Sequence, residues 1–369
     1  MRVLFTSVPA YGHLLPLLPT AVAARAAGDE VAVSTGASMG ATVGDLPFLP
    51  AGPEIPELFA EQARRPGAGD PTDATDLAGV TGLFSDTRID LGFDAALAAA
   101  KGFQAEVIVS DVVDLVAPLV AAALGIPWVV HGITVEFPPP MVQSFFDGMT
   151  RQAEARGLRV PSRAALLELW PSFLQHDGYR LPDDGIALRP LPYRPPGSAP
   201  APLPRGERPR VLITLGTTAD MSIITGKLLA SLSALDVEVV VTGAAVPDAP
   251  EDVRFVGFTP LADLLEGTDA VVTAGGAGTV IASLSHGIPM VALPTIADQP
   301  VLAERAASAG AALVLDPSEA EDRLASALRT VLDDPAPRSA AREVAARIAE
   351  LPAPEAAWAE LHRRLAQER

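Results

Sequence analysis

Short runs of β-branched and aliphatic residues alternate along the chain with longer segments of helical periodicity. An apolar run at residues 2–7 precedes a helical pattern at 16–27, which Gly28 ends, and another apolar run follows at 30–34. Strands that alternate with helices at this spacing form parallel sheets, because parallel strands need a crossover connection. The pattern therefore predicts an α/β domain at the amino-terminal end.

The same alternation continues along the first half and starts again at Arg210. A strand at residues 107–110 is predicted to end at Asp111, followed by a helix at 115–124 and a strand at 128–130. The strands predicted in the second half cover residues 210–215, 237–242, 254–256, 270–273, 290–293 and 312–315.

A proline-rich segment separates the two halves, with eight prolines between residues 190 and 209. Proline fixes φ and lacks an N–H group, so this segment cannot lie inside a helix or a central strand. We predict two Rossmann-like domains that face each other across a cleft, with ligands at the carboxyl ends of the strands. The predicted parts are an amino-terminal domain at 1–190, a linker at 191–209, a carboxyl-terminal domain at 210–352 and a final helix at 353–369 that returns to the first domain.

Composition narrows the classes of function. The chain has 369 residues and is 49% hydrophobic, enough for two packed cores. It has no cysteine, which excludes disulfides and thiol nucleophiles and fits a reducing cytoplasm. A net charge of −18 argues against nucleic acids and anionic membranes as partners. We expect a soluble, cytoplasmic protein, since no segment approaches the roughly 20 apolar residues of a membrane span; both a monomer and a homodimer remain possible.

A glycine-rich loop follows the strand predicted at residues 270–273 and leads into a helix. Glycines let backbone N–H groups approach an anion, and the helix N-terminus adds partial positive charge. An ordinary tight turn is the alternative interpretation. The pattern predicts a diphosphate site that needs no metal, formed by Ala274, Gly275, Gly276, Ala277, Gly278 and Thr279.

Four further residues could complete this site. Thr217 and Thr218 end the first strand of the second half and could donate hydroxyl hydrogen bonds to phosphates, although such threonines are more often helix N-caps. The pair Asp298 and Gln299 follows another strand, where a carboxylate and an amide suit sugar hydroxyls. A solvated loop is the alternative for this pair.

A histidine lies in the loop predicted at residues 9–13, just after the first strand. His13 could act as a general base, and Asp111, which ends a strand of the same sheet, could orient it and stabilise its charged form. Asp114 competes with Asp111 for this role.

A metal and a redox cofactor are both disfavoured. The sequence has no Asp-x-Asp and no cluster of histidine and carboxylate at metal-ligand spacing, so we expect no metal. The spacing Gly276-x-Gly278 with Asp298 imitates a dinucleotide-binding fingerprint, which leaves an NAD-dependent oxidoreductase as a minor alternative. Ile281, however, occupies the third glycine position.

The order of the motifs adds a family resemblance. Residues 255–261 read Phe-Val-Gly-Phe-Thr-Pro-Leu, the glycine loop follows, then Gly287-Ile288-Pro289 and Asp298-Gln299, while the amino terminus carries Gly-His-Leu-Leu-Pro-Leu at 12–17. This series resembles the GT-B glycosyltransferases that tailor bacterial macrolides, enediynes and aromatic polyketides. The segments at about residues 50–105 and 132–190 carry no motif of this family.

The resemblance implies an inverting transfer from a nucleoside diphosphate sugar, with thymidine diphosphate as the expected carrier and no other cofactor. Phe258, Thr259 and Leu261 would border the nucleobase, Thr217 and residues 276–279 would hold the diphosphate, and Asp298 with Gln299 would bind the sugar. His13 would be the base, supported by Asp111, and the helix around Trp358 would return to the first domain.

One residue departs from the family pattern. Ala274 stands where the family usually has a histidine that contacts the diphosphate. The departure keeps a second hypothesis open, in which the chain is a degenerate homologue that binds or activates another enzyme.

An apolar acceptor is expected against the segments that lack family motifs. Each aromatic residue there has a core role as its alternative. Glu136 could act as a base if the acceptor is attacked at carbon. The predicted acceptor-binding residues are Phe59, Phe84, Glu136, Phe137, Met141 and Phe145.

Overall fold

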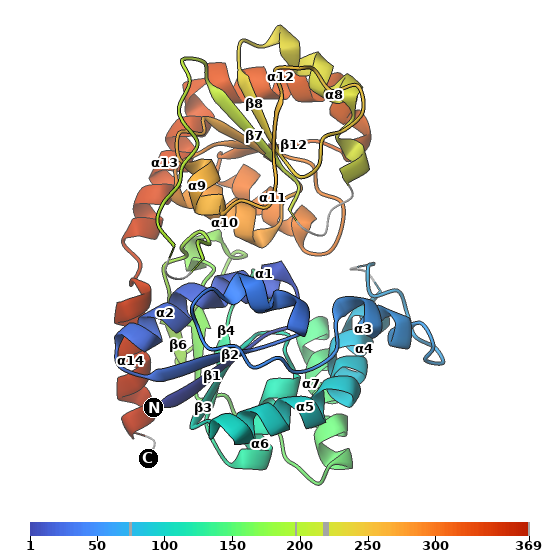
Figure 1. Cartoon of the computed structure of the whole chain (residues 1–369), viewed down its shortest axis with the longest axis vertical. Coiled ribbons are helices and arrows are strands. Elements are labelled where there is room, and N and C mark those ends of the chain that lie inside the picture. Colours follow the sequence, from blue (N-terminus) through green and yellow to red (C-terminus); the bar gives the residue numbers. More distant parts are fainter. Residues whose placement is uncertain (74–75, 196–197, 217–220, 368–369) are drawn as a thin grey trace. The chain divides into compact units, whose positions relative to one another are not determined.

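The computed structural model describes residues 1–73, 76–195, 198–216 and 221–367 and divides into two compact units. The first unit comprises residues 1–189 together with the carboxyl-terminal residues from 352 onward. The second comprises residues 190–194 and 198–351. Each unit is built around one parallel sheet with helices on its faces (Figure 1). The predicted α/β class with two Rossmann-like units is therefore confirmed.

The sheet of the first unit has six parallel strands in the order β2-β1-β3-β4-β5-β6. Its strands are β1 (Arg2–Thr6), β2 (Glu30–Ser34), β3 (Val107–Asp111), β4 (Trp128–His131), β5 (Ala165–Glu168) and β6 (Gly185–Ala187). Its helices are α1 (Tyr11–Leu14), η1 (Leu15–Leu17), α2 (Leu18–Ala26), η2 (Ala37–Val43), α3 (Ile55–Gln62), α4 (Leu77–Gly82), η3 (Leu83–Thr87), α5 (Arg88–Phe103), α6 (Val116–Leu124), α7 (Pro139–Ala155), η4 (Ser172–Leu174) and α14 (Pro354–Gln367).

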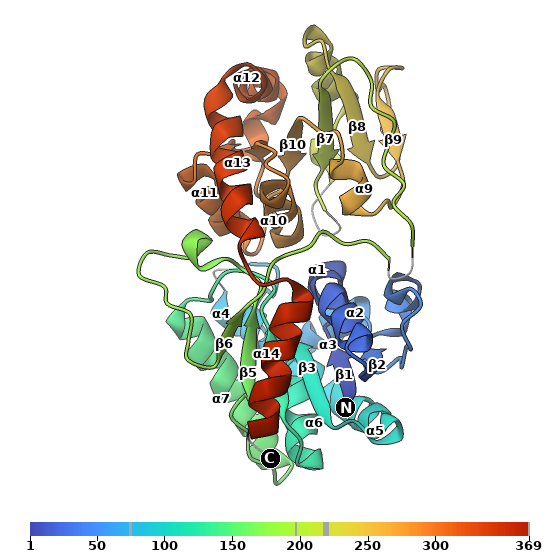
Figure 2. The ribbon, with the colours of Figure 1, turned by 90° about the vertical axis from the view of Figure 1, so that its left-hand side faces the viewer.

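Helices cover both faces of this sheet, so its central strands are apolar on both sides, as is usual for parallel sheets. On one face Leu4 and Ile108 pack against α5, α6 and α7. On the other face the Trp358 ring of α14 packs on Phe5, with ring centroids 5.8 Å apart. Figure 2 shows α14 alongside this sheet, next to α2.

Asp29 joins the two ends of the chain within the first unit. Its Oδ1 accepts a 2.7 Å hydrogen bond from the amino-terminal ammonium of Met1. Its Oδ2 accepts from Trp358 Nε1 at 2.8 Å and from His362 Nε2 at 2.6 Å. Burial alone raises the pKa of Asp29, but these donors outweigh it and lower that pKa below its ordinary value. One buried carboxylate therefore anchors α14.

The sheet of the second unit has six parallel strands in the order β12-β11-β10-β7-β8-β9. Its strands are β7 (Arg210–Thr214), β8 (Glu238–Thr242), β9 (Arg254–Val256), β10 (Ala270–Thr273), β11 (Met290–Ala292) and β12 (Ala312–Val314). Its helices are η5 (Met221–Ile223), α8 (Gly226–Ser231), η6 (Leu232–Ala234), α9 (Leu261–Leu265), α10 (Ala277–Ser285), α11 (Gln299–Ser308), η7 (Pro317–Glu319), α12 (Ala320–Asp333) and α13 (Pro335–Ala349).

The structure corrects the prediction at two places in the first unit. The segment predicted as a loop at residues 9–13 becomes helical at Tyr11, so His13 lies in the short helix α1 rather than in a loop. The helix predicted at 16–27 is divided into η1 and α2, each with a proline in its first turn, where the missing N–H costs no hydrogen bond.

Across the described part of the chain, no helix is long and apolar enough to cross a membrane.

Candidate active site

His13 and Asp111 come together at the carboxyl end of β3. The His13 Nδ1 atom lies 3.3 Å from Asp111 Oδ1. The imidazole is 22% exposed, whereas the carboxylate is fully buried. An imidazole that donates its Nδ1–H to a buried carboxylate presents Nε2 as a proton acceptor. The geometry suits a general base that one carboxylate orients.

Backbone donors hold Asp111 in its ionised form. Val8 N donates to Oδ2 at 2.8 Å, and Val113 N donates to Oδ1 at 2.9 Å. Burial is the largest single influence and raises the pKa of Asp111. The charge and hydrogen bond of His13, with the two amides, outweigh burial and lower that pKa below its ordinary value. The alternative partner, Asp114, is paired with Arg88 instead, at 2.9 Å.

Aromatic rings predicted to contact an acceptor extend away from His13. The Phe84 ring, from the π-helical turn η3, lies with its centroid 6.2 Å from that of His13. Phe145 contacts both Phe84 and Phe137 edge to face, at 6.2 and 5.9 Å. Phe145 is only 7% exposed and belongs to the core, so it supports its neighbours instead of offering open surface.

The other predicted acceptor residues lie at different depths. Phe59 on α3 is half-buried, and so is Met141 on α7. Glu136 is exposed, and its Oε2 lies 2.7 Å from His176 Nε2. No sequence signal predicted this contact, because His176 comes forty residues later, in a stretch without motifs.

Glu168 is a further buried carboxyl that sequence reasoning missed. It accepts from the Tyr179 hydroxyl at 2.9 Å and from Trp170 N at 3.0 Å. Burial raises its pKa to about 7. The strand that Glu168 ends was not predicted from the sequence, so no pattern marked this carboxyl as a site residue.

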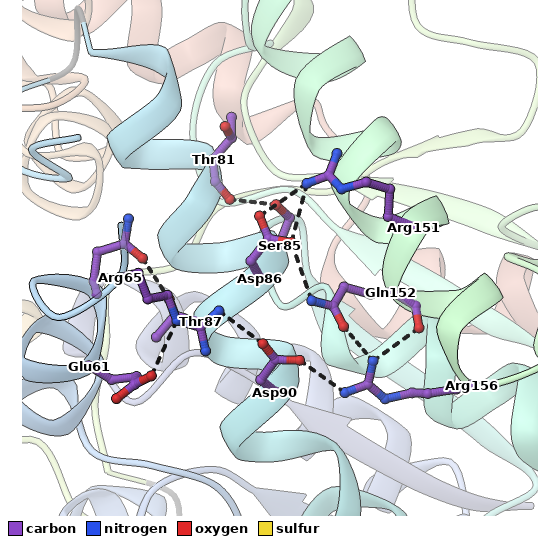
Figure 3. Close-up of polar contacts among 11 residues, drawn as sticks. Glu61, Arg65, Thr81, Ser85, Asp86, Thr87, Asp90, Arg151, Gln152 and Arg156 are labelled. Carbon is purple, nitrogen blue, oxygen red and sulfur yellow. Dashed lines mark hydrogen bonds and ion pairs between the residues drawn. The ribbon is translucent and has the colours of Figure 1, made fainter. Parts of the chain in front are cut away.

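An ion-pair network joins the helices that carry these aromatic residues (Figure 3). Asp86 of η3 accepts from Arg151 of α7, and Asp90 of α5 lies 3.2 Å from Arg156, the C-cap residue of α7. Arg65, just beyond α3, lies 2.9 Å from the same Asp90. The network therefore links α3, η3, α5 and α7.

In the second unit, the glycine loop presents the N-terminus of α10. Thr273 Oγ1 accepts from Gly275 N at 3.1 Å, and Gly276 is the N-cap residue of the helix without a side-chain cap. Gly275 has φ +86°, and a Cβ there would lie 2.9 Å from the carbonyl oxygen of Gln299. At Gly276 and Gly278 an added Cβ would meet nothing within 4 Å. The helix N-terminus is thus open to an anion.

Two predicted donor residues, Ala274 and Gln299, behave differently from the expectation. Ala274 is fully buried in the core of the second unit, so its side chain does not border the loop's open side. Gln299 is also buried, and its Oε1 accepts from Thr295 N and from Thr295 Oγ1, both at 2.9 Å. The Gln299 amide oxygen therefore fixes its own loop. Asp298 next to it is half-buried.

The residues predicted to border the nucleobase lie at the start of α9. Phe258 is 61% exposed, with its ring centroid 6.4 Å from that of Tyr193. Thr259 donates to the carbonyl oxygen of Gly257 at 3.1 Å, and Leu261 begins α9 half-buried. Ala277 and Thr279 lie in the first turn of α10. Thr217 and Thr218 fall outside the described residues.

In the described part of the chain, no group of three or more histidines, cysteines or carboxylates could hold a metal ion.

Comparisons with known proteins agree with this architecture. Residues 226–363 match the family model described as erythromycin biosynthesis protein CIII-like, C-terminal domain. The elloramycin glycosyltransferase ElmGT of Streptomyces olivaceus is 32% identical over 98% of this chain and 97% of its own length. The L-demethylnoviosyl transferase of Streptomyces niveus is 30% identical, over 94% of this chain and 93% of its own length.

Solved structures give the same result over nearly the whole length. The glycosyltransferase SsfS6 of Streptomyces sp. SF2575, complexed with thymidine diphosphate, superposes with a TM-score of 0.83 at 27% identity, covering 98% of this chain and 99% of that one. The spinosyn rhamnosyltransferase SpnG, complexed with spinosyn aglycone, has a TM-score of 0.80 at 25% identity and covers 98% of this chain and 100% of its own.

Two parallel α/β units, together with these relatives and structural neighbours, identify the chain as a two-domain nucleotide-sugar glycosyltransferase. The chain belongs to the GT-B glycosyltransferases of antibiotic and polyketide pathways. This membership decides against the NAD-dependent oxidoreductase.

Proposed function

We propose that this protein transfers a deoxysugar from a thymidine diphosphate donor to a small apolar aglycone, with inversion at the anomeric carbon and without a metal. The thymidine diphosphate bound by the neighbour SsfS6 supports the choice of donor, and the aglycone bound by SpnG supports the class of acceptor. The observation that carries the proposal is the 3.3 Å contact between His13 Nδ1 and Asp111 Oδ1.

His13 acts as the general base in this proposal. Its Nε2 accepts the proton of the acceptor hydroxyl while that oxygen attacks the anomeric carbon. Asp111 stabilises the imidazolium that forms, because its ionised carboxylate accepts the Nδ1–H hydrogen bond. A single displacement on the face opposite the leaving group inverts the anomeric centre.

The leaving diphosphate is stabilised by backbone groups. The open N-terminus of α10 presents N–H donors and partial positive charge where negative charge develops. The exposed Phe258 provides an aromatic surface for the nucleobase, and Asp298 offers a carboxylate to the sugar hydroxyls.

The acceptor lies against the aromatic surface next to His13. Phe84 and Phe137 offer apolar edges supported by Phe145, which favours a flat, apolar aglycone over a sugar chain. Glu136, paired with His176, is the alternative base for an acceptor attacked at carbon.

Substitution of the base tests the proposal. His13→Ala should abolish turnover of a polyketide acceptor panel and leave thymidine diphosphate affinity within about twofold of the unmodified chain. Affinity is measured by calorimetric titration with and without EDTA. If His13→Ala retained turnover, His13 could not be the general base. If transfer required a divalent metal, the metal-free mechanism would be wrong.

The second hypothesis, a non-catalytic binding or activating partner, keeps one observation in its favour. Ala274 replaces the histidine expected by resemblance, and its burial leaves no charged side chain there to contact a diphosphate. Sugar transfer by the purified chain alone would exclude this hypothesis. Thymidine diphosphate binding without transfer, recovered only with another protein, would support it.

A further inference from the structure

Two buried carboxylates lie on one turn beneath the candidate base. Asp111 and Asp114 are 1% and 3% exposed, and Asp114 N donates to the carbonyl oxygen of Asp111 at 3.1 Å. A single imidazole cannot balance two buried negative charges, because each uncompensated charge in the interior is costly. The pair therefore needs a second cation.

Arg88, the first residue of α5, supplies that cation. It is 4% exposed, and its Nε and Nη2 atoms lie 3.1 and 2.9 Å from Asp114 Oδ1. Burial is the largest influence on Asp114; although Arg88 opposes it, burial together with the nearby charge of Asp111 raises the pKa of Asp114 above its ordinary value. With Arg88 assigned to Asp114, the carboxylate of Asp111 remains available to His13.

The same guanidinium also reaches the segment that carries His13. Arg88 Nη2 donates to the carbonyl oxygen of Ser7 at 2.9 Å, and the next amide, Val8 N, donates to Asp111. Ala10 N then donates to Val8 O at 2.7 Å, and His13 N donates to Ala10 O at 3.0 Å. A short series of contacts thus connects Arg88 to the backbone of the base.

We propose that Arg88 and Asp114 are positioning residues for the His13–Asp111 pair. Arg88 neutralises Asp114, so that Asp111 interacts with the imidazole alone, and it fixes the segment that leads into α1. The inference rests on the proposed role of His13 as base.

Among the described residues, His131 also interacts with Asp111. His131 of β4 is fully buried between Thr20 and its own neighbour Gly132, and burial lowers its pKa to about 4. His131 is therefore neutral near pH 7 and does not compete for the charge of Asp111. The balance at this site is set by Arg88, Asp114, Asp111 and His13.

Asp114→Asn tests the charge assignment. With Asp114 neutral, the Arg88 guanidinium is drawn to Asp111 and competes with the imidazole. We expect the ¹⁵N spectrum of His13 to lose its Nδ1–H tautomer, and the acid limb of the kcat/KM profile to move to lower pH. We also expect kcat to fall at least about tenfold, with the acceptor KM changed by less than about twofold. Loss of activity with an unchanged tautomer and pH profile would overturn the proposal.

The double variant Arg88→Met with Asp114→Asn is the matched control, because it removes both charges together. It should return the His13 tautomer and the pH profile to those of the unmodified chain. A double variant with the same spectrum as Asp114→Asn alone would contradict the charge balance. Should Asp114→Asn not fold, the double variant still decides: the original tautomer supports the proposal, and an altered one overturns it.

Arg88→Lys separates charge from geometry, since lysine keeps the charge but loses the fork that spans Asp114 and Ser7. We expect the tautomer to be kept while kcat falls. An unchanged kcat would remove the positioning of the His13 segment from the proposal. The spectra are recorded without substrate, so they remain informative even if His13→Ala retains turnover and the proposed base is wrong.

Discussion

The candidate sites of the two units are formed by different kinds of group, side chains in the first unit and backbone amides in the second. In the first unit the candidate groups are side chains, His13 and Asp111, fixed by buried charges and backbone amides. In the second unit the candidate groups are backbone amides at the start of α10, and glycines keep side chains away from them. The first unit should therefore be sensitive to the loss of a functional group, and the second to the addition of an atom.

The largest effect is expected from Asp111→Asn. Asparagine keeps much of the shape but cannot stabilise an imidazolium by charge, so kcat should fall on the order of 10²–10⁴-fold. Initial rates against acceptor concentration measure this effect, with thymidine diphosphate affinity as the control. A decrease below tenfold would show that the first unit does not depend on this side chain.

The stability of the first unit should also depend on whether the Glu168 carboxyl is ionised. Its pKa rises from an ordinary value of 4.5 to about 7 in the folded chain, so folding favours the protonated form. Its stabilising contribution is complete below pH 4.5 and is lost as the pH rises through 7, on the order of 2–4 kcal/mol in all. Urea unfolding of the unmodified chain and of Glu168→Gln, compared from pH 5 to 8, measures it. A slope that persists in Glu168→Gln would assign the effect to another group.

Two glycines of the second unit provide a matched pair. Gly275→Ala should destabilise the chain by about 1–3 kcal/mol, because its φ of +86° is strained for alanine and the new Cβ would approach the Gln299 carbonyl oxygen. Gly278→Ala should leave unfolding unchanged, because its Cβ has free space, yet it should weaken thymidine diphosphate binding by narrowing the open side of the helix N-terminus. Thermal unfolding and calorimetric titration separate the two. If Gly278→Ala bound thymidine diphosphate as tightly as the unmodified chain, the diphosphate would not bind at the N-terminus of α10.

The smallest effect is expected from Arg151→Ala in the network of Figure 3. Arg151 is 62% exposed, and its ion pair with Asp86 is screened by water and salt. Removal should cost about 0.2–1 kcal/mol of stability at low salt and less at high salt. Denaturant unfolding at two ionic strengths checks the difference. A cost independent of salt would indicate packing as its source.

The sequence predicted the repeating strand-helix units well, because buried parallel strands are continuous apolar runs of recognisable length. Arg254–Val256 and Ala270–Thr273 form strands over the predicted residues, and Asp111 ends its strand as expected. The strands β5 and β6 were not predicted, since their short runs lie in segments whose pattern resembles a loop.

Side-chain partners across the fold were harder to predict. The sequence left Asp111 and Asp114 as competitors for His13, and only the three-dimensional position of Arg88, more than twenty residues earlier, distinguishes them. Ala274 and Gln299 occupy motif positions, yet burial directs one into the core and the other into its own loop. A motif indicates that residues lie near a site, while packing decides which of their atoms face it.

The contacts of Asp29 affect the order in which the two units can fold during synthesis. Its partners are Met1 and two residues of α14, Trp358 and His362. Because domains fold as they leave the ribosome, the sheet of the first unit must wait with its α2 side uncovered while the whole second unit is made. The second unit can fold as soon as it emerges, whereas the first unit lacks part of its core until α14 has been made.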